Sequence, residues 1–139
     1  MINSFSIPRI KSNIKIGFIE FENNIKSQED EGKWLIANVF VNSKSFQGSI
    51  KASFRIDDFI RFRNGCKNIS SGVCNDAIFS CDEEWMKIII IKIDCLGHYA
   101  IKVNLKSEEE CLSYKFMTDE FVIRELTDDV NSFVEKLLA

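Results

Sequence analysis

The sequence contains few residues that break or cross-link a chain. In 139 residues there are one proline, six glycines and five cysteines. So little proline and glycine excludes a collagen-like, linker-like or low-complexity segment. The odd number of cysteines, none of them in a C-x-x-C spacing, argues against both a disulfide framework and a zinc site. We therefore expect free thiols, buried or half-buried, in a reducing cytosol.

Long apolar runs are also missing. The longest, at residues 88–91, is far shorter than the ~20 residues that span a bilayer. No apolar segment follows the first basic residues, as an export signal would require. These absences predict a cytoplasmic protein that does not enter a membrane. The aromatic residues are twelve phenylalanines against two tyrosines and two tryptophans, which favours packing in the core over an exposed stacking surface.

Motifs for catalysis or cofactor binding are absent too. The sequence has no G-x-x-x-x-G-K-[ST], no G-x-G-x-x-G and no G-x-S-x-G. Its only histidine, His98, follows Cys95 by three residues, but both flank a tight turn without a glycine-rich elbow. Local hydrogen bonding of His98 is therefore expected rather than a nucleophilic pair. The acidic runs consist of adjacent residues without EF-hand spacing, so we expect no metal site, no cofactor and no enzyme activity.

The clearest structural pattern lies at residues 84–106. Four β-branched residues at 88–91 predict a strand that is buried on both faces over part of its length. Asp94 and Gly97 favour a tight turn after it. Apolar and polar residues then alternate over 99–106, which predicts a second strand with one wet face. We place this hairpin at the centre of a sheet that the rest of the chain covers.

The same alternation predicts strands earlier in the chain. They are a short edge strand at 5–7, an unpaired outer strand at 14–22 that Asn23 and Asn24 end, and a long antiparallel hairpin of 33–41 with 46–54. A charged loop at 27–32 separates the second of these from the third.

Apolar residues next recur at spacings of three and four, which predicts a helix over residues 57–66 with Asp57 as its cap. Arg61 and Arg63 are expected to point outward. A basic helix that grips phosphate is one interpretation, and a solvated face beside a sheet is the other. The acidic remainder of the chain favours the second, so we expect no nucleic-acid partner.

The C-terminal part adds two strands and a second helix. Residues 77–81 and 111–117 alternate as strands do. An apolar face over 122–137 predicts the helix, with Thr127 as a cap if the helix starts late. Residues 119–126 fit either strand or helix.

These elements together predict a single α+β domain over residues 1–139. We expect a mostly antiparallel sheet of about six strands with two helices packed on it. The length suits one hydrophobic core, and no internal repeat is visible.

Charge is distributed unevenly along the chain. Residues 44–67 carry a net charge of +4, residues 68–139 carry −7, and the whole chain carries −3. The acidic side chains form three runs, namely Glu29, Asp30 and Glu31, then Asp82, Glu83 and Glu84, then Glu108, Glu109 and Glu110. These turns either make a negative surface that docks into a basic cleft, such as that of a nuclease toxin, or are a generically acidic surface.

Several short segments together resemble the WapI-type family of bacterial immunity proteins. They are Lys33-Trp34-Leu35-Ile36, Ile56-Asp57-Asp58-Phe59, Glu84-Trp85-Met86-Lys87-Ile88, Leu96-Gly97-His98-Tyr99, and Tyr114-Lys115-Phe116 before the last helix. The resemblance extends over about residues 15–138.

The resemblance implies a small cytosolic protein encoded beside a secreted polymorphic toxin, as in contact-dependent inhibition. It would bind the C-terminal domain of that toxin and block it, which requires no catalytic residues. The three acidic runs are then the candidate toxin contacts. The alternative is a non-catalytic binding or regulatory module unrelated to toxin immunity.

Overall fold

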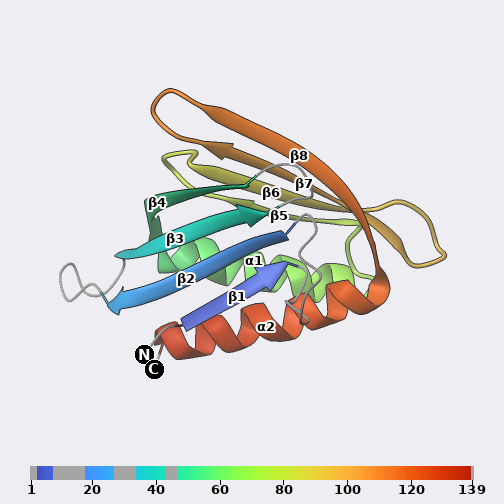
Figure 1. Cartoon of the computed structure of the whole chain (residues 1–139). Coiled ribbons are helices and arrows are strands. Elements are labelled where there is room, and N and C mark those ends of the chain that lie inside the picture. The colour runs from blue at the N-terminus through green and yellow to red at the C-terminus, as the bar shows by residue number, and fades with distance from the viewer. Residues whose placement is uncertain (1–2, 8–17, 27–33, 43–46, 139) are drawn as a thin grey trace.

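Eight β-strands and two α-helices follow one another as two rounds of four strands and a helix (Figure 1). The computed structural model describes residues 3–7, 18–26, 34–42 and 47–138. The first round contains β1 (Asn3–Ile7), β2 (Phe18–Lys26), β3 (Trp34–Asn42), β4 (Gln47–Arg55) and α1 (Ile56–Ser70). The second contains β5 (Asp76–Ser80), β6 (Met86–Lys92), β7 (His98–Lys106), β8 (Cys111–Asp119) and α2 (Glu120–Leu138).

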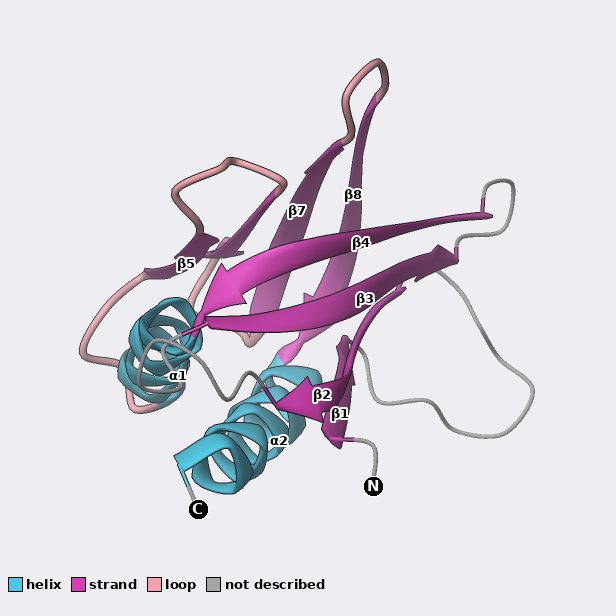
Figure 2. Cartoon of the chain, turned by 90° about the vertical axis from the view of Figure 1, so that its left-hand side faces the viewer, coloured by secondary structure: helices cyan, strands magenta, loops and turns pink. Residues whose placement is uncertain are grey.

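Each round of strands forms its own antiparallel sheet. The first sheet has the order β1-β2-β3-β4 and the second β5-β6-β7-β8, so strands pair with their neighbours in the sequence. Such local connections cost little loop-closure entropy. Figure 2 shows the strands of the first sheet running across those of the second. The prediction of an α+β fold with two helices is confirmed. The prediction named one sheet of about six strands, whereas the structure has eight strands in two sheets.

The predicted central hairpin forms the two middle strands of the second sheet, β6 and β7. Ile88 and Ile90 are fully buried, whereas Ile89 and Ile91 on the opposite face are half-buried. Gly97 in the turn between the strands has a φ of +90°, a conformation that side chains rarely adopt. The period-2 pattern therefore placed the hairpin correctly, but the hairpin centres only the second sheet.

Both sheets and both helices contribute to one hydrophobic core. The helices lie side by side along one side of the sheets (Figures 1 and 2). Phe59 of α1 is fully buried, and its ring lies 5.1 Å from the rings of Phe79 in β5 and Phe133 in α2. It also lies 5.7 Å from Phe54 in β4 and 6.4 Å from Phe5 in β1. Phenylalanine packing is thus the contact that joins the two rounds.

Two predictions about the second strand were wrong. Asn23 and Asn24 do not end β2, which continues to Lys26 through an irregular register between Glu22 and Ile25. A bulge of this kind absorbs residues that would otherwise break the alternation. β2 also lies between β1 and β3, so it is not an outer strand. The predicted residues 14–17 of this strand and the loop at 27–32 lie outside the described residues.

Helix α1 is longer than predicted and is capped differently. It runs from Ile56 to Ser70, with Arg55 as its N-cap residue. The backbone N–H of Arg55 donates to the carboxylate of Asp58 at 3.0 Å. Asp58 therefore caps the helix from its third position, where a side chain can reach back, and the assignment of the cap to Asp57 was wrong.

The boundary that the sequence left open is resolved at residue 120. Strand β8 continues to Asp119, and α2 begins at Glu120. The Asp119 carboxylate accepts a hydrogen bond from the N–H of Val122 at 3.0 Å, which caps the helix. Thr127 is not a cap, since it lies inside α2 and donates to the carbonyl of Ile123. Neither helix in the described part of the chain has the length and apolar composition needed to cross a membrane.

Candidate functional site

Two of the three acidic runs come together at one end of the second sheet. Residues 82–84 belong to the turn between β5 and β6, and residues 108–110 to the turn between β7 and β8. In a sheet of consecutive antiparallel strands these two turns lie at the same end. The backbone N–H of Lys106, the last residue of β7, donates to the carbonyl of Trp85 at 2.9 Å, which continues the pairing of β6 and β7 up to these turns. We call this region the acidic end.

The side chains of these two runs are exposed, so the acidic end presents its carboxylates to solvent. The third run, Glu29, Asp30 and Glu31, lies outside the described residues. The structure thus brings together six of the residues predicted as toxin contacts.

A shallow pocket lies within the acidic end, with a volume of about 530 Å³. Its lining mixes charges, since Asp82 and Glu84 face Lys87 and Lys106 around it. Polar, sulfur-containing and apolar side chains complete the lining, namely Ser80, Cys81, Met86, Asn104, Leu105, Cys111 and Ser113. Charged side chains of both signs thus surround the pocket, whereas typical small-molecule sites are predominantly hydrophobic.

The turn between β5 and β6 holds a non-glycine residue in the left-handed region. Glu84 has a φ of +57°, and its N–H donates to the carbonyl of Cys81 at 3.1 Å. This conformation costs of order 1 kcal/mol or more for a residue with a Cβ atom. Because neither glycine nor asparagine occupies position 84, this conformation could not be predicted from the residue type.

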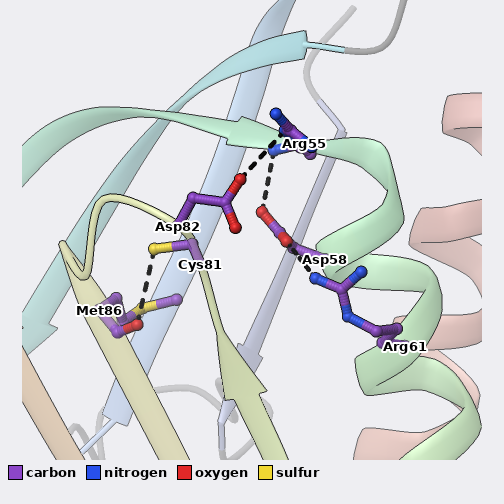
Figure 3. Close-up of polar contacts among 6 residues, drawn as sticks. All are labelled: Arg55, Asp58, Arg61, Cys81, Asp82 and Met86. Atoms are coloured by element: carbon purple, nitrogen blue, oxygen red, sulfur yellow. Dashed lines mark hydrogen bonds and ion pairs between the residues drawn. The ribbon is translucent and has the colours of Figure 1, made fainter.

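An ion pair anchors this turn to the first sheet (Figure 3). The Nε of Arg55, the last residue of β4, lies 3.3 Å from a carboxylate oxygen of Asp82. The side chains are 49% and 60% exposed, so the pair contributes orientation more than stability. Asp82, predicted as a toxin contact, is therefore partly neutralised by Arg55.

Asp58 lies beneath this ion pair and is the one buried charged residue in the described ranges, at 2% exposure. Its second oxygen accepts a hydrogen bond from the Arg61 guanidinium at 2.6 Å (Figure 3). Burial raises the pKa of the Asp58 carboxyl, against the opposing effects of the Arg55 N–H and of Arg61. The carboxylate therefore joins the end of β4 to the start of α1 in a largely dry corner.

Sequence reasoning missed this corner. Asp57 and Asp58 are adjacent, and only the fold shows which of them reaches back to Arg55. A signal was present, because an acid three residues after a cap position is the usual partner in a capping box.

Two arginines of α1 have acceptors within the protein. Arg61 is engaged by Asp58, and the Nε of Arg63 donates to the side-chain oxygen of Asn64 at 3.3 Å. Arg55, just before α1, is paired with Asp82, so all three arginines of this region have an acceptor within the protein.

In the described part of the chain, the His98 side chain bonds Asp94 rather than Cys95. His98 opens β7, as expected, and its Nδ1 lies 2.7 Å from a carboxylate oxygen of Asp94. This contact holds the pKa of the Asp94 carboxyl below its usual value. Among the residues that the structure describes, no hydrogen bond joins Cys95 to His98, and no cluster of three potential ligands could hold a metal ion.

The five cysteines are free and differ in environment. Cys66 and Cys81 are buried, and burial raises the pKa of the Cys66 thiol to about 12. The Cys81 thiol donates to the carbonyl of Met86 at 3.7 Å, and burial raises its pKa as well. The other three, Cys74, Cys95 and Cys111, are exposed, so the expectation of buried or half-buried thiols was wrong for them.

Two solved structures show a fold similar to that of this chain. The crystal structures of MRP1/MRP2 from Trypanosoma brucei align over 100% of this chain and 88% of theirs, with a TM-score of 0.55 and 6% sequence identity. A guide-RNA-binding protein complex bound to a guide RNA aligns over 100% of this chain and 94% of its own, with a TM-score of 0.53 and 7% identity. At such low identity the likeness concerns the fold alone.

Comparison at the level of sequence identifies the family. No curated protein is significantly similar to the chain. The immunity protein WapI-like family, in contrast, matches residues 7–138, which includes β2 to β8 and both helices. The chain therefore belongs to the immunity protein WapI-like family.

Proposed function

We propose that this protein is a cytoplasmic immunity protein that binds the C-terminal domain of a cognate secreted toxin and neutralises it without catalysis. Family membership supports toxin immunity as the general role. Inhibition by binding requires only a complementary surface, with a few buried anchors inside a polar rim. The toxin would be blocked by covering or distorting its active site.

The acidic end is the observation that carries this proposal beyond the family. Two separate turns contribute Asp82, Glu83 and Glu84 together with Glu108, Glu109 and Glu110 to one end of a sheet. A concentration of negative charge at one place accelerates association with a basic surface by electrostatic steering. A toxin that acts on nucleic acid has such a surface, so a nuclease is the toxin class that this end suits best.

A titration with charge-reversed variants tests the role of the acidic end. The toxin domain encoded beside this gene is titrated with the double variant Glu108→Lys/Glu109→Lys. We expect at least a tenfold loss of affinity, mainly through slower association at low salt. The matched control is Asp128→Lys/Glu135→Lys, which reverses two exposed charges on α2. Equal affinities for the two double variants would show that the acidic end is not a contact.

RNA binding, the activity named for one protein of similar fold, is the competing role. Two observations argue against it here. The chain carries a net charge of −3, and its three central arginines, Arg55, Arg61 and Arg63, are engaged within the protein. Affinity for RNA depends largely on free cations that replace the counterions of phosphate.

A binding or regulatory module unrelated to immunity is the remaining alternative. It would share the fold and the lack of catalysis but would have no toxin partner. Absence of a toxin gene next to this one, together with failure to bind any toxin domain of its genome, would favour it.

A further inference from the structure

The outer face of the second sheet, turned away from the core, carries exposed aliphatic side chains. Met117 is 59%, Ile93 48% and Ile78 46% exposed, and Ile89 and Ile91 are half-buried. The strand register places Ile91, Ala100 and Met117 in one row, with Ile78 and Ile89 in the next. We call these six residues, Ile78, Ile89, Ile91, Ile93, Ala100 and Met117, the aliphatic patch. Ala100 is buried at 3% exposure, so the accessible apolar area comes from β5, β6 and β8 and from Ile93 just after β6. Several accessible apolar side chains on one face differ from the single ones that are normal on a surface.

Three exposed lysines adjoin the aliphatic patch. Lys102 of β7 and Lys115 of β8 are paired directly opposite each other, and Lys87 of β6 lies one row further along. All three are exposed, and within the described ranges none makes an ion pair or a side-chain hydrogen bond. Like charges directly opposite in a sheet are destabilising. An arrangement that costs stability in the free protein suits a face that acquires carboxylates from a partner.

We infer that this outer face is the main docking surface for the toxin domain, which presents an apolar centre flanked by carboxylates to the aliphatic patch and to Lys102 and Lys115. The inference rests on the proposed function and adds the face and the chemistry of its partner. Exposed apolar area supplies the anchor of such an interface, and the lysines fix its register.

The occupant is a protein rather than a nucleic acid because strands β5–β8 present no phenylalanine, tyrosine or tryptophan on this face, and its one ring, that of His98, is paired with Asp94. The phenylalanines and tyrosines of β5–β8 are buried or half-buried on the inner face, namely Phe79, Tyr99, Tyr114 and Phe116. Recognition of single strands depends on stacked aromatic side chains as well as cations. The acidic end, at the end of the same strands, would also repel a phosphate backbone.

The sheet face alone is too small for a stable interface, so the neighbouring turns must belong to it. Four strands are about 19 Å across and eight residue steps about 27 Å long, so the area of the face is roughly 500 Å². A stable complex buries about 800 Å² on each partner. The turns at both ends must therefore contribute, which includes the acidic end and the turn at Leu96, 82% exposed, at the opposite end. The sheet face and the acidic turns thus form one continuous interface.

The outer face of the first sheet provides a matched control. Ile36 of β3 is 38% exposed, and Lys51 of β4 is exposed on the same face. Substituting these residues makes the same chemical change on a comparable sheet surface in the same chain.

The test is a calorimetric titration of the adjacent toxin domain into four purified variants. Met117→Glu and Lys115→Glu each change the second sheet, whereas Ile36→Glu and Lys51→Glu change the first. We expect at least a tenfold weaker affinity for the first two and less than a twofold change for the controls. Lys115→Glu should also raise the midpoint of thermal unfolding, because it replaces a like-charge pair by an opposite-charge pair. Weakened binding with raised stability cannot result from misfolding.

Each remaining outcome is decisive. Tight binding by the wild type with unchanged affinity of Met117→Glu and Lys115→Glu overturns the docking face and leaves immunity standing. No binding of the toxin domain by the wild type overturns both proposals. A fluorescent 20-nucleotide uridine RNA is titrated in parallel at physiological salt. Binding of that probe, lost in Lys115→Glu but kept in Lys51→Glu, would assign the lysines to phosphate and overturn the protein partner.

Discussion

The guanidinium of Arg55, the last residue of the first sheet, lies 3.3 Å from the carboxylate of Asp82 in the first turn of the second. Directly below, the backbone N–H of the same arginine donates to buried Asp58. One residue therefore fixes the start of α1 with its main chain and the position of the acidic end with its side chain.

Loss of the Asp58 carboxylate should destabilise the protein. Replacing Asp58 by alanine removes the acceptor of the Arg55 N–H and of Arg61, which should lower the free energy of unfolding by about 1–2 kcal/mol. Urea denaturation at neutral pH measures the change. The control, Asp57→Ala, alters an exposed acid in the same turn and should cost no more than about 0.5 kcal/mol. Equal losses would contradict the assignment of the cap.

Asp58 should make the protein more stable as the pH falls from neutral. Because burial raises its pKa in the folded state, the folded protein binds more protons than the unfolded chain between the two pKa values. Its contribution to stability therefore falls as the pH rises through that window and returns on acidification. Wild type should gain stability relative to Asp58→Asn from about pH 7 to about pH 4. The opposite trend at Asp94, whose pKa is lowered, is common to both proteins and cancels.

The protein should unfold in one cooperative step, as expected of a single domain. Phe59 contacts rings from both sheets and from α2, so the two rounds share one core. Single-tryptophan variants report the halves separately, with Trp34 in β3 and Trp85 just before β6. The urea transitions that the two tryptophans report should coincide. Phe59→Ala should lower the free energy of unfolding derived from each of them by the same amount, about 3–5 kcal/mol. Separate midpoints would show two independent units.

Removing the backbone strain at Glu84 should increase the free energy of unfolding. Glu84→Gly removes the Cβ atom that makes a φ of +57° unfavourable and should stabilise the protein by about 0.5–1 kcal/mol. Thermal unfolding measures the change. Glu83→Gly adds the same flexibility without relieving strain, so it should be neutral or destabilising. If both variants behaved alike, the turn would not hold Glu84 in the left-handed region.

Thiol reactivity should separate the cysteines into two groups. Cys74, Cys95 and Cys111 are exposed and should react within minutes with a chromogenic disulfide reagent near pH 8, whereas Cys66 and Cys81 should react only after denaturation. The raised pKa of Cys66, about 12, leaves almost no thiolate at that pH. Mass spectrometry of the labelled protein identifies the sites. Rapid labelling of Cys66 in the folded state would contradict its burial.

Local patterns predicted most of the fold, because hairpins and the C-terminal helix depend on neighbours in the sequence. The period-2 alternation placed the hairpin of β6 and β7, and the spacing of three and four placed α2. The division into two sheets was not predictable in this way. A strand alternates in the same manner whichever sheet it joins, and the bulge at Glu22 to Ile25 interrupts even that signal.

The site was less predictable because it depends on strand order. Residues 82–84 and 108–110 are separated by β6 and β7, and they share an end only because each strand pairs with its neighbour in sequence. The aliphatic patch was hidden for a different reason. A run of isoleucines such as 88–91 indicates burial on both faces, whereas Ile89 and Ile91 are half-buried on an outer face without a covering layer in the described chain.

The central claim is neutralisation of a toxin, and a growth experiment tests it most directly. The C-terminal domain of the toxin encoded beside this gene is induced in cells with and without this protein. We predict that cells stop growing without it, survive with it, and yield a one-to-one complex of nanomolar affinity when the two proteins are co-purified. Continued toxicity in the presence of soluble, folded protein, with no complex recovered, would contradict the account.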